Sequence, residues 1–196
     1  MPVVNRLKIV GVMGSGTEPF TELAQAAGEA VAESGCHLLT GAGAGVMHAA
    51  AQAFVQSRNR KGLSLGIVRA HSLPMLHGSS RAWEPMAPIN DYVELPIKTH
   101  LPESGERGQD FYSRNHINVL TSDAVVVLPG NAGTKTELDL ALQYGRPTIL
   151  FLGKHRLHGR TAADLQEQHP GRLQIANDKT DLSACLRRAL EFRSPE

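Results

Sequence analysis

The chain has 196 residues, of which 41% are hydrophobic, and its 20 Lys and Arg residues nearly balance 19 Asp and Glu residues, giving a formal net charge of +1. This length and composition are sufficient to bury a substantial core, and we expect a single domain over residues 1–196. The sequence has no run of like charges and therefore lacks the basic stripe of many nucleic-acid-binding proteins. No nucleic-acid partner is expected.

Cysteine usage and hydropathy predict the compartment. Cys36 and Cys185 are far apart in sequence and form no CxxC pair, and the first residues do not resemble a secretory leader. Reduced thiols and a cytoplasmic location are therefore expected. No apolar stretch approaches the roughly 20 residues that a membrane-spanning helix needs, so no membrane partner is expected.

Short apolar runs that end at Gly, Pro or a polar residue predict five buried strands. They are LKIVGVMG (7–14), HLLTG (37–41), LSLGIV (63–68), DAVVVLP (123–129) and PTILFLG (147–153). Ala- and Leu-rich segments with helical spacing predict helices at 20–33, 45–57, 111–121 and 134–144. A weaker helix is expected at 161–168 and a final helix at 180–192.

The alternation of strands and helices predicts an α/β fold, with one doubly wound parallel sheet and helices on both faces. In the helix at 134–144, Leu138, Ala141 and Leu142 fall on one face that can pack against the sheet. Residues 70–110 interrupt this rhythm with five prolines and hold at most one strand, near residues 92–95. We expect a long loop insertion there, and long loops in compact domains are often functional.

Three turns rich in small residues follow predicted strands, and each leads into a helix. They contain Gly14, Ser15 and Gly16, with a helix start marked by Thr17 and Pro19; Gly41, Gly43, Gly45 and Met47; and Pro129, Gly130, Asn131, Gly133 and Thr134. In a parallel sheet the carboxyl ends of the strands share one edge, so these turns are expected to gather there. Glycine allows a ligand to approach the backbone, and helix starts offer free N–H groups, so the edge suits a phosphate.

Two alternatives bear on this interpretation. A single glycine-rich turn is also explained by tight strand-to-helix geometry without a ligand, although three turns in register weaken that explanation. The turns do not form the usual GxGxxG of one βαβ unit, and no acidic residue follows at the ribose-binding position. Ordinary NAD binding is therefore not expected.

Glu137 has a structural explanation of its own. Thr134-Lys-Thr-Glu137 matches the capping box, in which the Thr side chain caps a helix and the Glu reaches back to a backbone N–H. Such a cap contributes roughly 1 kcal/mol. Considered alone, this segment predicts a capping role for Glu137.

PGNAGTKTE (129–137) resembles the PGGxGTxxE signature of the Lonely Guy (LOG) family, often mislabelled lysine decarboxylases, and GAGAGVM (41–47) resembles that family's GGGxxGLM turn. The resemblance implies a Rossmann-like homodimer that cleaves nucleoside 5′-monophosphates to free base and ribose 5-phosphate, with no cofactor. It also implies that Arg114 and Glu137 are catalytic, with Arg114 holding phosphate or ribose and Glu137 activating water. Where the family has MHxRK, this chain keeps only the Arg, in FYSRN (111–115).

SRNHINVLTSDAVVVLPGNAGT (113–134) is also similar to the molybdenum-cofactor carrier proteins, whose pattern is RNxxxV..SD followed by a GGxGT turn. This resemblance implies binding of the molybdenum cofactor, a phosphate-bearing pterin, without hydrolysis. The two functions remain alternatives, with the hydrolase slightly favoured because Arg114 and Glu137 are both present. A DNA-processing protein of the same superfamily is a third possibility, against which the near-neutral charge argues.

The remaining candidates have ordinary explanations. Arg114 could instead form a surface or inter-subunit salt bridge, and Asn115 could contact a ligand or bond within a helix turn. His155 and His158 lack a third metal ligand nearby, so no metal site is expected. His48 could reach the ligand, whereas Met13 is expected in a wall or the core. The charged loop 98–110 could cover the ligand or remain solvated.

Overall fold

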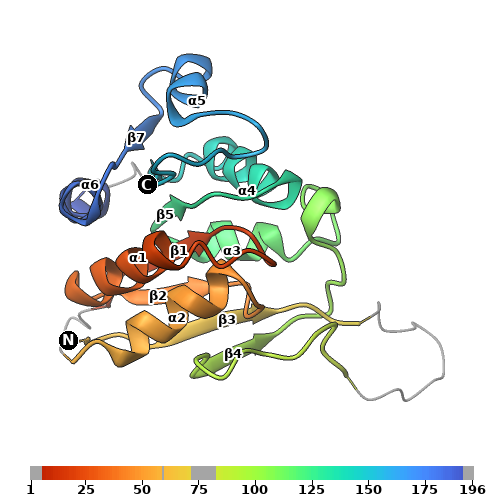
Figure 1. Ribbon diagram of the computed structural model, residues 1–196. Helices are drawn as coiled ribbons and strands as arrows, with labels where there is room; N and C mark the ends of the chain where they lie inside the picture. The colour runs from red at the N-terminus through yellow and green to blue at the C-terminus, as the bar shows by residue number, and fades with distance from the viewer. Residues whose placement is uncertain (1–5, 59, 72–82, 192–196) are drawn as a thin grey trace, which may run out of the picture.

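A computed structural model describes residues 6–58, 60–71 and 83–191. They build a seven-stranded sheet in the order β4-β3-β2-β1-β5-β6-β7, in which all neighbouring strands are parallel (Figure 1). The strands are β1 (Ile9–Met13), β2 (His37–Thr40), β3 (Ser64–Val68), β4 (Leu95–Lys98), β5 (Ala124–Val127), β6 (Thr148–Leu150) and β7 (Leu173–Ile175). The helices are α1 (Thr21–Glu33), α2 (Val46–Gln56), α3 (Asn115–Thr121), α4 (Ala132–Gln143), α5 (Ala162–Gln168) and α6 (Lys179–Glu191), with a 3-10 turn η1 (Gly105–Arg107). The prediction of a doubly wound parallel α/β fold is confirmed.

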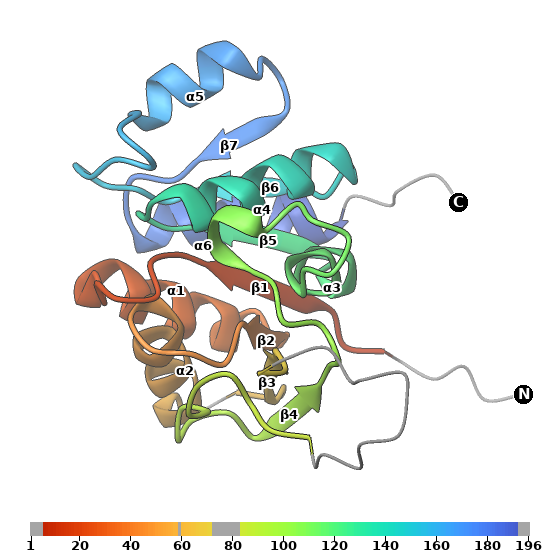
Figure 2. The same cartoon turned by 90° about the vertical axis from the view of Figure 1, so that its right-hand side faces the viewer.

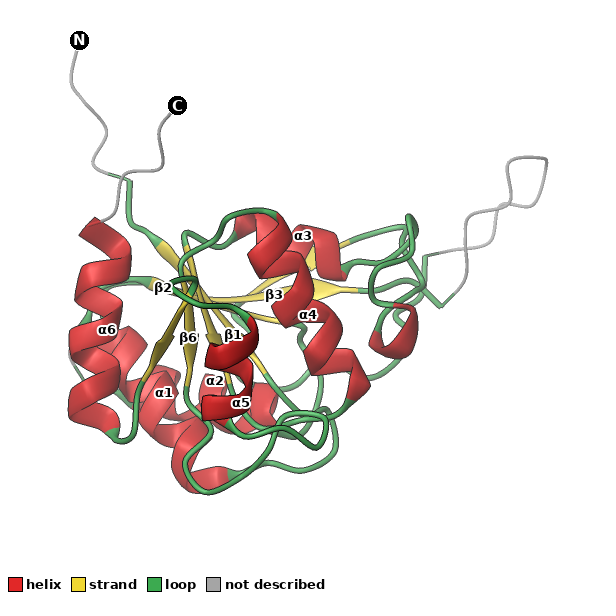
Figure 3. Ribbon diagram, turned by 90° about the horizontal axis from the view of Figure 1, so that it is seen from above, coloured by secondary structure: helices red, strands yellow, loops and turns green. Residues whose placement is uncertain are grey.

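Helices cover both faces of the sheet, as the view from above shows (Figure 3). Val10, Val12 and Val126 point into a core shared with α1, α2 and α6. Val125 and Val127 point to the opposite core, shared with α3, α4 and α5. The Val-rich runs form strands because β-branched side chains pack well on a pleated surface, and alternate residues here are buried on opposite faces.

Small residues allow α1 and α2 to lie close together on one face. A methyl group at Gly28 of α1 would overlap the carbonyl oxygen of Ala50 in α2. Ala24, Ala27 and Ala50 are fully buried nearby. The Ala-rich composition of both segments is therefore explained by close helix packing as well as by helix propensity.

Three elements differ from the expectations. The predicted strand at residues 92–95 lies at Leu95–Lys98 instead, because Glu94 is held by Arg60 and by the backbone N–H of Ser64 just before the strand begins. Strand β7 was not predicted, since Gln174 interrupts it and it has no apolar run such as the one that predicted β6. Helix α3 begins at Asn115 rather than near residue 111, because turns occupy the preceding segment.

The order in which successive strands are added to the sheet reverses direction between β1 and β5. From β1 the strands add outward through β2 and β3 to β4, and the chain then returns to place β5 on the other side of β1. In such sheets ligands bind outside the carboxyl ends of the strands at this switch point. Figure 2 shows α1 and α4 on either side of this part of the sheet. Among the described residues, no helix combines the length and apolarity required to cross a membrane.

Candidate functional site

A cavity of about 410 Å³ opens at the switch point. The turns after β1, β2 and β5 contribute to its walls, as the sequence predicts. Of the residues proposed from the sequence, it is lined by Gly14, Ser15, Gly16, Gly41, Gly43, Met47, Arg114, Asn115, Asn131, Gly133, Thr134 and Glu137. The fold thus brings segments that are more than 100 residues apart in sequence to a single hollow.

The turn after β1 is locked by hydrogen bonds to both neighbouring turns. The Ser15 N–H donates to the carbonyl of Pro129 at 3.0 Å, and the Ser15 carbonyl accepts from the N–H of Val46 at 2.9 Å. The Ser15 hydroxyl accepts from the N–H groups of Thr17 and Glu18. Helix α1 follows this turn and starts at Thr21, within one residue of the predicted start at residue 20.

Gly45, Pro129 and Gly130 do not line the cavity, and their contacts are with the protein itself. Gly45 has φ +62° and lies against the backbone of Ser15, so a side chain there would be strained. A methyl group at Gly130 would overlap the Thr134 hydroxyl. These residues allow the three turns to pack together, so they support the cavity without contacting a ligand directly.

Helix α4 presents its start to the cavity, but not through a capping box. The helix begins at Ala132 with Asn131 as its N-cap, and no side chain caps it. Thr134 therefore lies within the first turn, and the predicted capping box of Thr134 and Glu137 is wrong. The chain does form a capping box elsewhere, between Thr161 and Asp164 at the start of α5. The first-turn N–H groups of α4 consequently have no side-chain acceptor, and Asn131, Gly133 and Thr134 line the cavity.

Arg114 is a buried cation that lacks a matching anion. Its relative exposure is 7%, and its Nε and Nη1 atoms have no hydrogen-bond partner. The guanidinium lies over Gly41, where any side chain would overlap it. No carboxylate oxygen of the described residues lies within 4.0 Å of its nitrogens. Burial lowers the pKa of Arg114, the nearby Glu137 opposes this change, and Arg69 adds to it.

Glu137 is buried in the same hollow, one turn below the start of α4. Its exposure is 8%, and its Oε1 accepts a hydrogen bond from the Asn118 amide at 3.2 Å. Burial raises the pKa of Glu137, while Arg114 and the Asn118 amide lower it. Glu137 therefore faces the cavity as a weakly solvated carboxyl group without an ion-pair partner within 4.0 Å.

Two polar residues near the site were not predicted from the sequence. Arg69 follows β3, lines the cavity and donates from Nη1 to the Ser104 hydroxyl at 2.9 Å. Arg69 could have been predicted from the sequence, because it comes directly after an apolar strand, and the glycine-rich turns were predicted at the same edge of the sheet. Asn118 carried no such signal, because only the packing of α3 against α4 brings its amide to Glu137. The loop residues Ser104 and Gly105 also line the cavity, as a covering loop would.

The other candidates lie outside the cavity lining. His48 stacks edge-on against Tyr92, with ring centroids 5.1 Å apart, and Met13 is a buried core residue. His155 packs against Phe20, and the N–H of His158 donates to the Gly130 carbonyl. Within the described part of the chain, no group of three or more His, Cys, Asp or Glu side chains is arranged to hold a metal ion.

Comparisons with known proteins agree on a superfamily. The model of the SLOG cluster4 family matches residues 7–182. An uncharacterised protein of Archaeoglobus fulgidus is 29% identical over 144 residues, which cover 72% of this chain and 78% of the relative.

Solved structures extend the comparison to ligand-binding proteins. The molybdenum cofactor carrier protein of Chlamydomonas reinhardtii superposes with a TM-score of 0.68 at 26% identity, covering 95% of this chain and 100% of the other. The molybdenum cofactor binding protein of the phototrophic bacterium Rippkaea orientalis gives 0.68 at 27% identity, covering 94% and 98%. The similarity therefore extends over nearly the whole of this chain.

Proposed function

Because the chain belongs to the SLOG cluster4 family, whose model matches residues 7–182, we propose that its cavity binds a phosphate-bearing pterin of the molybdenum-cofactor type and that the protein acts as a carrier. The observation that carries this proposal is Arg114, a buried guanidinium with two unpartnered N–H-bearing atoms beside the cavity. Burying an unpaired charge is costly, so a ligand anion that completes its hydrogen bonds is the expected compensation. The two cofactor-binding proteins support the choice of ligand.

The walls provide complementary groups for such a ligand. A phosphate fits the uncapped start of α4, where Gly133 and Thr134 offer backbone N–H groups and a hydroxyl. Arg114 supplies a planar fork of donors for phosphate oxygens. If ionised, Glu137 can accept hydrogen bonds from the ring N–H and amino groups of a pterin. The volume of about 410 Å³ lies in the range of small-molecule sites.

Hydrolysis of nucleoside 5′-monophosphates is the second candidate, and the pairing of Arg114 with Glu137 favours it. Both side chains line one cavity, and neither forms an ion pair within 4.0 Å. A carboxyl group with a raised pKa is suited to proton transfer with an attacking water. The same Arg114 would then hold the 5′-phosphate.

One experiment separates the two functions. Purified protein is mixed anaerobically with the molybdenum cofactor and passed through a desalting column, and molybdenum in the protein fraction is measured by mass spectrometry. In parallel, the protein is incubated with AMP and isopentenyl-AMP, and ribose 5-phosphate is assayed. Retained molybdenum without ribose 5-phosphate supports the carrier, whereas ribose 5-phosphate that disappears in Glu137→Gln supports the hydrolase. Failure of both assays contradicts the proposed site.

We also propose that the protein is a homodimer. On the face of the sheet covered by α3, the edge strand β4 carries two exposed apolar side chains, Leu95 at 47% and Ile97 at 36%. Leu63, just before β3, is 43% exposed. Leu120 of α3 is 46% exposed on the same side. Exposed apolar side chains on a surface can mark contact sites, and an apolar face can be its own complement about a twofold axis.

Leu95→Lys should convert this dimer to a monomer, because it places a charge among the exposed apolar side chains of the proposed interface. The molecular mass in solution, measured by light scattering after size exclusion, is expected to fall to about half. The matched control is Leu23→Lys on α1, a partly buried residue on the opposite face of the sheet. A monomeric unmodified protein, or a Leu95→Lys variant of unchanged mass, would contradict the proposed interface.

A further inference from the structure

A second cavity lies at the opposite edge of the sheet, where the strands begin. Its volume is about 480 Å³, and its walls come from the starts of β6 and β7, the end of α4 and the last turns of α6. Because the sheet is parallel, this edge is separated from the first cavity by the length of the strands. None of the residues that line the first cavity contributes to it.

The second cavity is cationic. Arg146, Arg172 and Arg188 line it, and its lining contains no Asp or Glu. None of the three forms an ion pair within 4.0 Å in the described part of the chain. An anion in this hollow can accept charge-assisted hydrogen bonds from guanidinium groups that have no anionic partner.

The hydrogen bonds of these arginines all go to neutral acceptors. Arg146 donates from Nη2 to the carbonyl of Leu120 at 2.7 Å, and Arg172 donates to the carbonyl of Leu142. Arg188 donates to the Gln174 amide oxygen and to the Cys185 sulfur. The Arg146 Nε atom is buried and has no partner.

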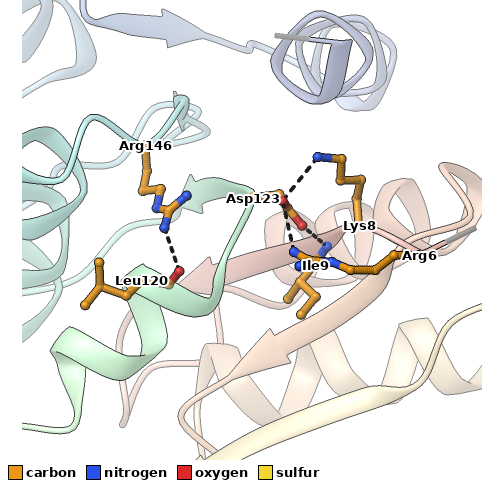
Figure 4. A network of polar contacts seen from close by, with 6 residues as sticks. All are labelled: Arg6, Lys8, Ile9, Leu120, Asp123 and Arg146. Atoms are coloured by element: carbon orange, nitrogen blue, oxygen red, sulfur yellow. Dashed lines mark hydrogen bonds and ion pairs between the residues drawn. The ribbon is translucent and has the colours of Figure 1, made fainter. Parts of the chain in front are cut away.

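Helix capping accounts for only part of this arrangement. Leu120 and Leu142 lie in the last turns of α3 and α4, where arginine side chains stabilise free carbonyl groups. Each guanidinium has five N–H donors, so capping leaves several of them available. The nearby carboxylate of Asp123 is already engaged by Arg6, Lys8 and the N–H of Ile9 (Figure 4). It therefore does not neutralise the arginines of the cavity.

Apolar side chains form part of the remaining wall, together with Thr148 and Gln174. Leu142, Pro147 and Leu173 line the cavity beside the arginines. We propose that this second cavity is a binding site for a small organic phosphate, whose phosphate group is held by Arg172 and Arg188 and whose apolar ring lies against these side chains. Bidentate guanidinium–phosphate bonds supply the specificity, and the volume suits a molecule of this size.

The test uses phenyl phosphate as the probe, with phenol and inorganic phosphate as the matched half-molecules. Binding is followed by two-dimensional NMR of the uniformly labelled protein, through the backbone signals of Gly145, Leu173 and Ala189. The signals of Gly41 and Gly133 report the first cavity separately. Phenyl phosphate is expected to shift the first set and to bind more tightly than either half-molecule, because only it engages the arginines and the apolar wall together.

Arg188→Gln and Arg172→Gln should each raise the dissociation constant at this cavity about tenfold, since each removes charge-assisted hydrogen bonds. Arg156→Gln is the control, because Arg156 is an exposed arginine outside the cavity that also donates to a neutral carbonyl. Arg188 is on the surface of α6, so its variant tests the site even if Arg172→Gln fails to fold. The proposal would be overturned if phenyl phosphate shifts none of these backbone signals, or if inorganic phosphate binds as tightly as phenyl phosphate. It would also be overturned if Arg188→Gln binds phenyl phosphate as tightly as the unmodified protein.

Discussion

Arg114→Met is expected to weaken binding of the phosphorylated ligand by about a hundredfold and, at the same time, to stabilise the ligand-free protein. The first effect follows from the loss of charge-assisted hydrogen bonds to the ligand. The second follows because Arg114 is buried with Nε and Nη1 unpartnered. Removing a buried charge that has no ion-pair partner relieves its desolvation cost, here by about 2 kcal/mol.

Two measurements on the same variant test whether weaker ligand binding is accompanied by higher stability. Isothermal titration calorimetry gives ligand affinity, and urea denaturation without ligand gives the free energy of unfolding. Arg107→Met is the matched control, since Arg107 is exposed and pairs with Glu103 and Asp110 on the neighbouring loop. Its effect on both quantities is expected to be small, because exposed ion pairs contribute little. A less stable Arg114→Met protein with normal affinity would show that Arg114 is a structural residue.

Glu137→Gln is expected to remove a pH dependence of stability. Burial raises the pKa of Glu137 above its usual 4.5, so the folded state binds this proton more tightly than the unfolded state. Between the two pKa values the folded state therefore holds more protons, and the free energy of unfolding falls as pH rises. The contribution is fully present below about 4.5 and is lost above the folded pKa.

The measurement is urea denaturation of the unmodified protein and of Glu137→Gln between pH 4 and pH 8. The stability of the variant relative to the unmodified protein should increase with pH, at no more than about 1.4 kcal/mol per pH unit for a single proton. Glutamine retains an oxygen that accepts from Asn118, so the hydrogen bond at 3.2 Å is preserved. Glu167→Gln, an exposed position on α5, measures the effect of losing a carboxylate from the surface. A difference between Glu137→Gln and the unmodified protein that stays constant with pH would contradict the raised pKa.

These two predictions also bear on the choice between carrier and hydrolase. A carrier requires Arg114 for affinity and tolerates Glu137→Gln, since the amide oxygen still accepts a hydrogen bond from the ligand. A hydrolase loses turnover in Glu137→Gln by a factor on the order of 10² to 10⁴ while still binding substrate. The pair of variants therefore separates binding from chemistry within one cavity.

The sequence by itself determined the architecture and the location of the cavity. Val-rich runs such as residues 123–129 predict strands buried on both faces, which is the property of a parallel sheet. Parallel strands place the turns that follow them at one edge, so the glycine turns at 14–16, 41–45 and 130–133 had to converge. These inferences succeed because they depend on local periodicity and on chain direction.

Only the tertiary structure decided what the polar side chains do. Glu137 occupies a capping-box position by spacing, yet α4 starts at Ala132 and turns the carboxyl group toward Asn118. Arg114 lies over Gly41, and Arg69 joins it from the end of β3. Contacts between residues distant in sequence depend on how helices pack on the sheet, and a local pattern does not encode that packing. The position of the cavity could therefore be predicted from the sequence, whereas the unpaired guanidinium group of Arg114 beside it could not.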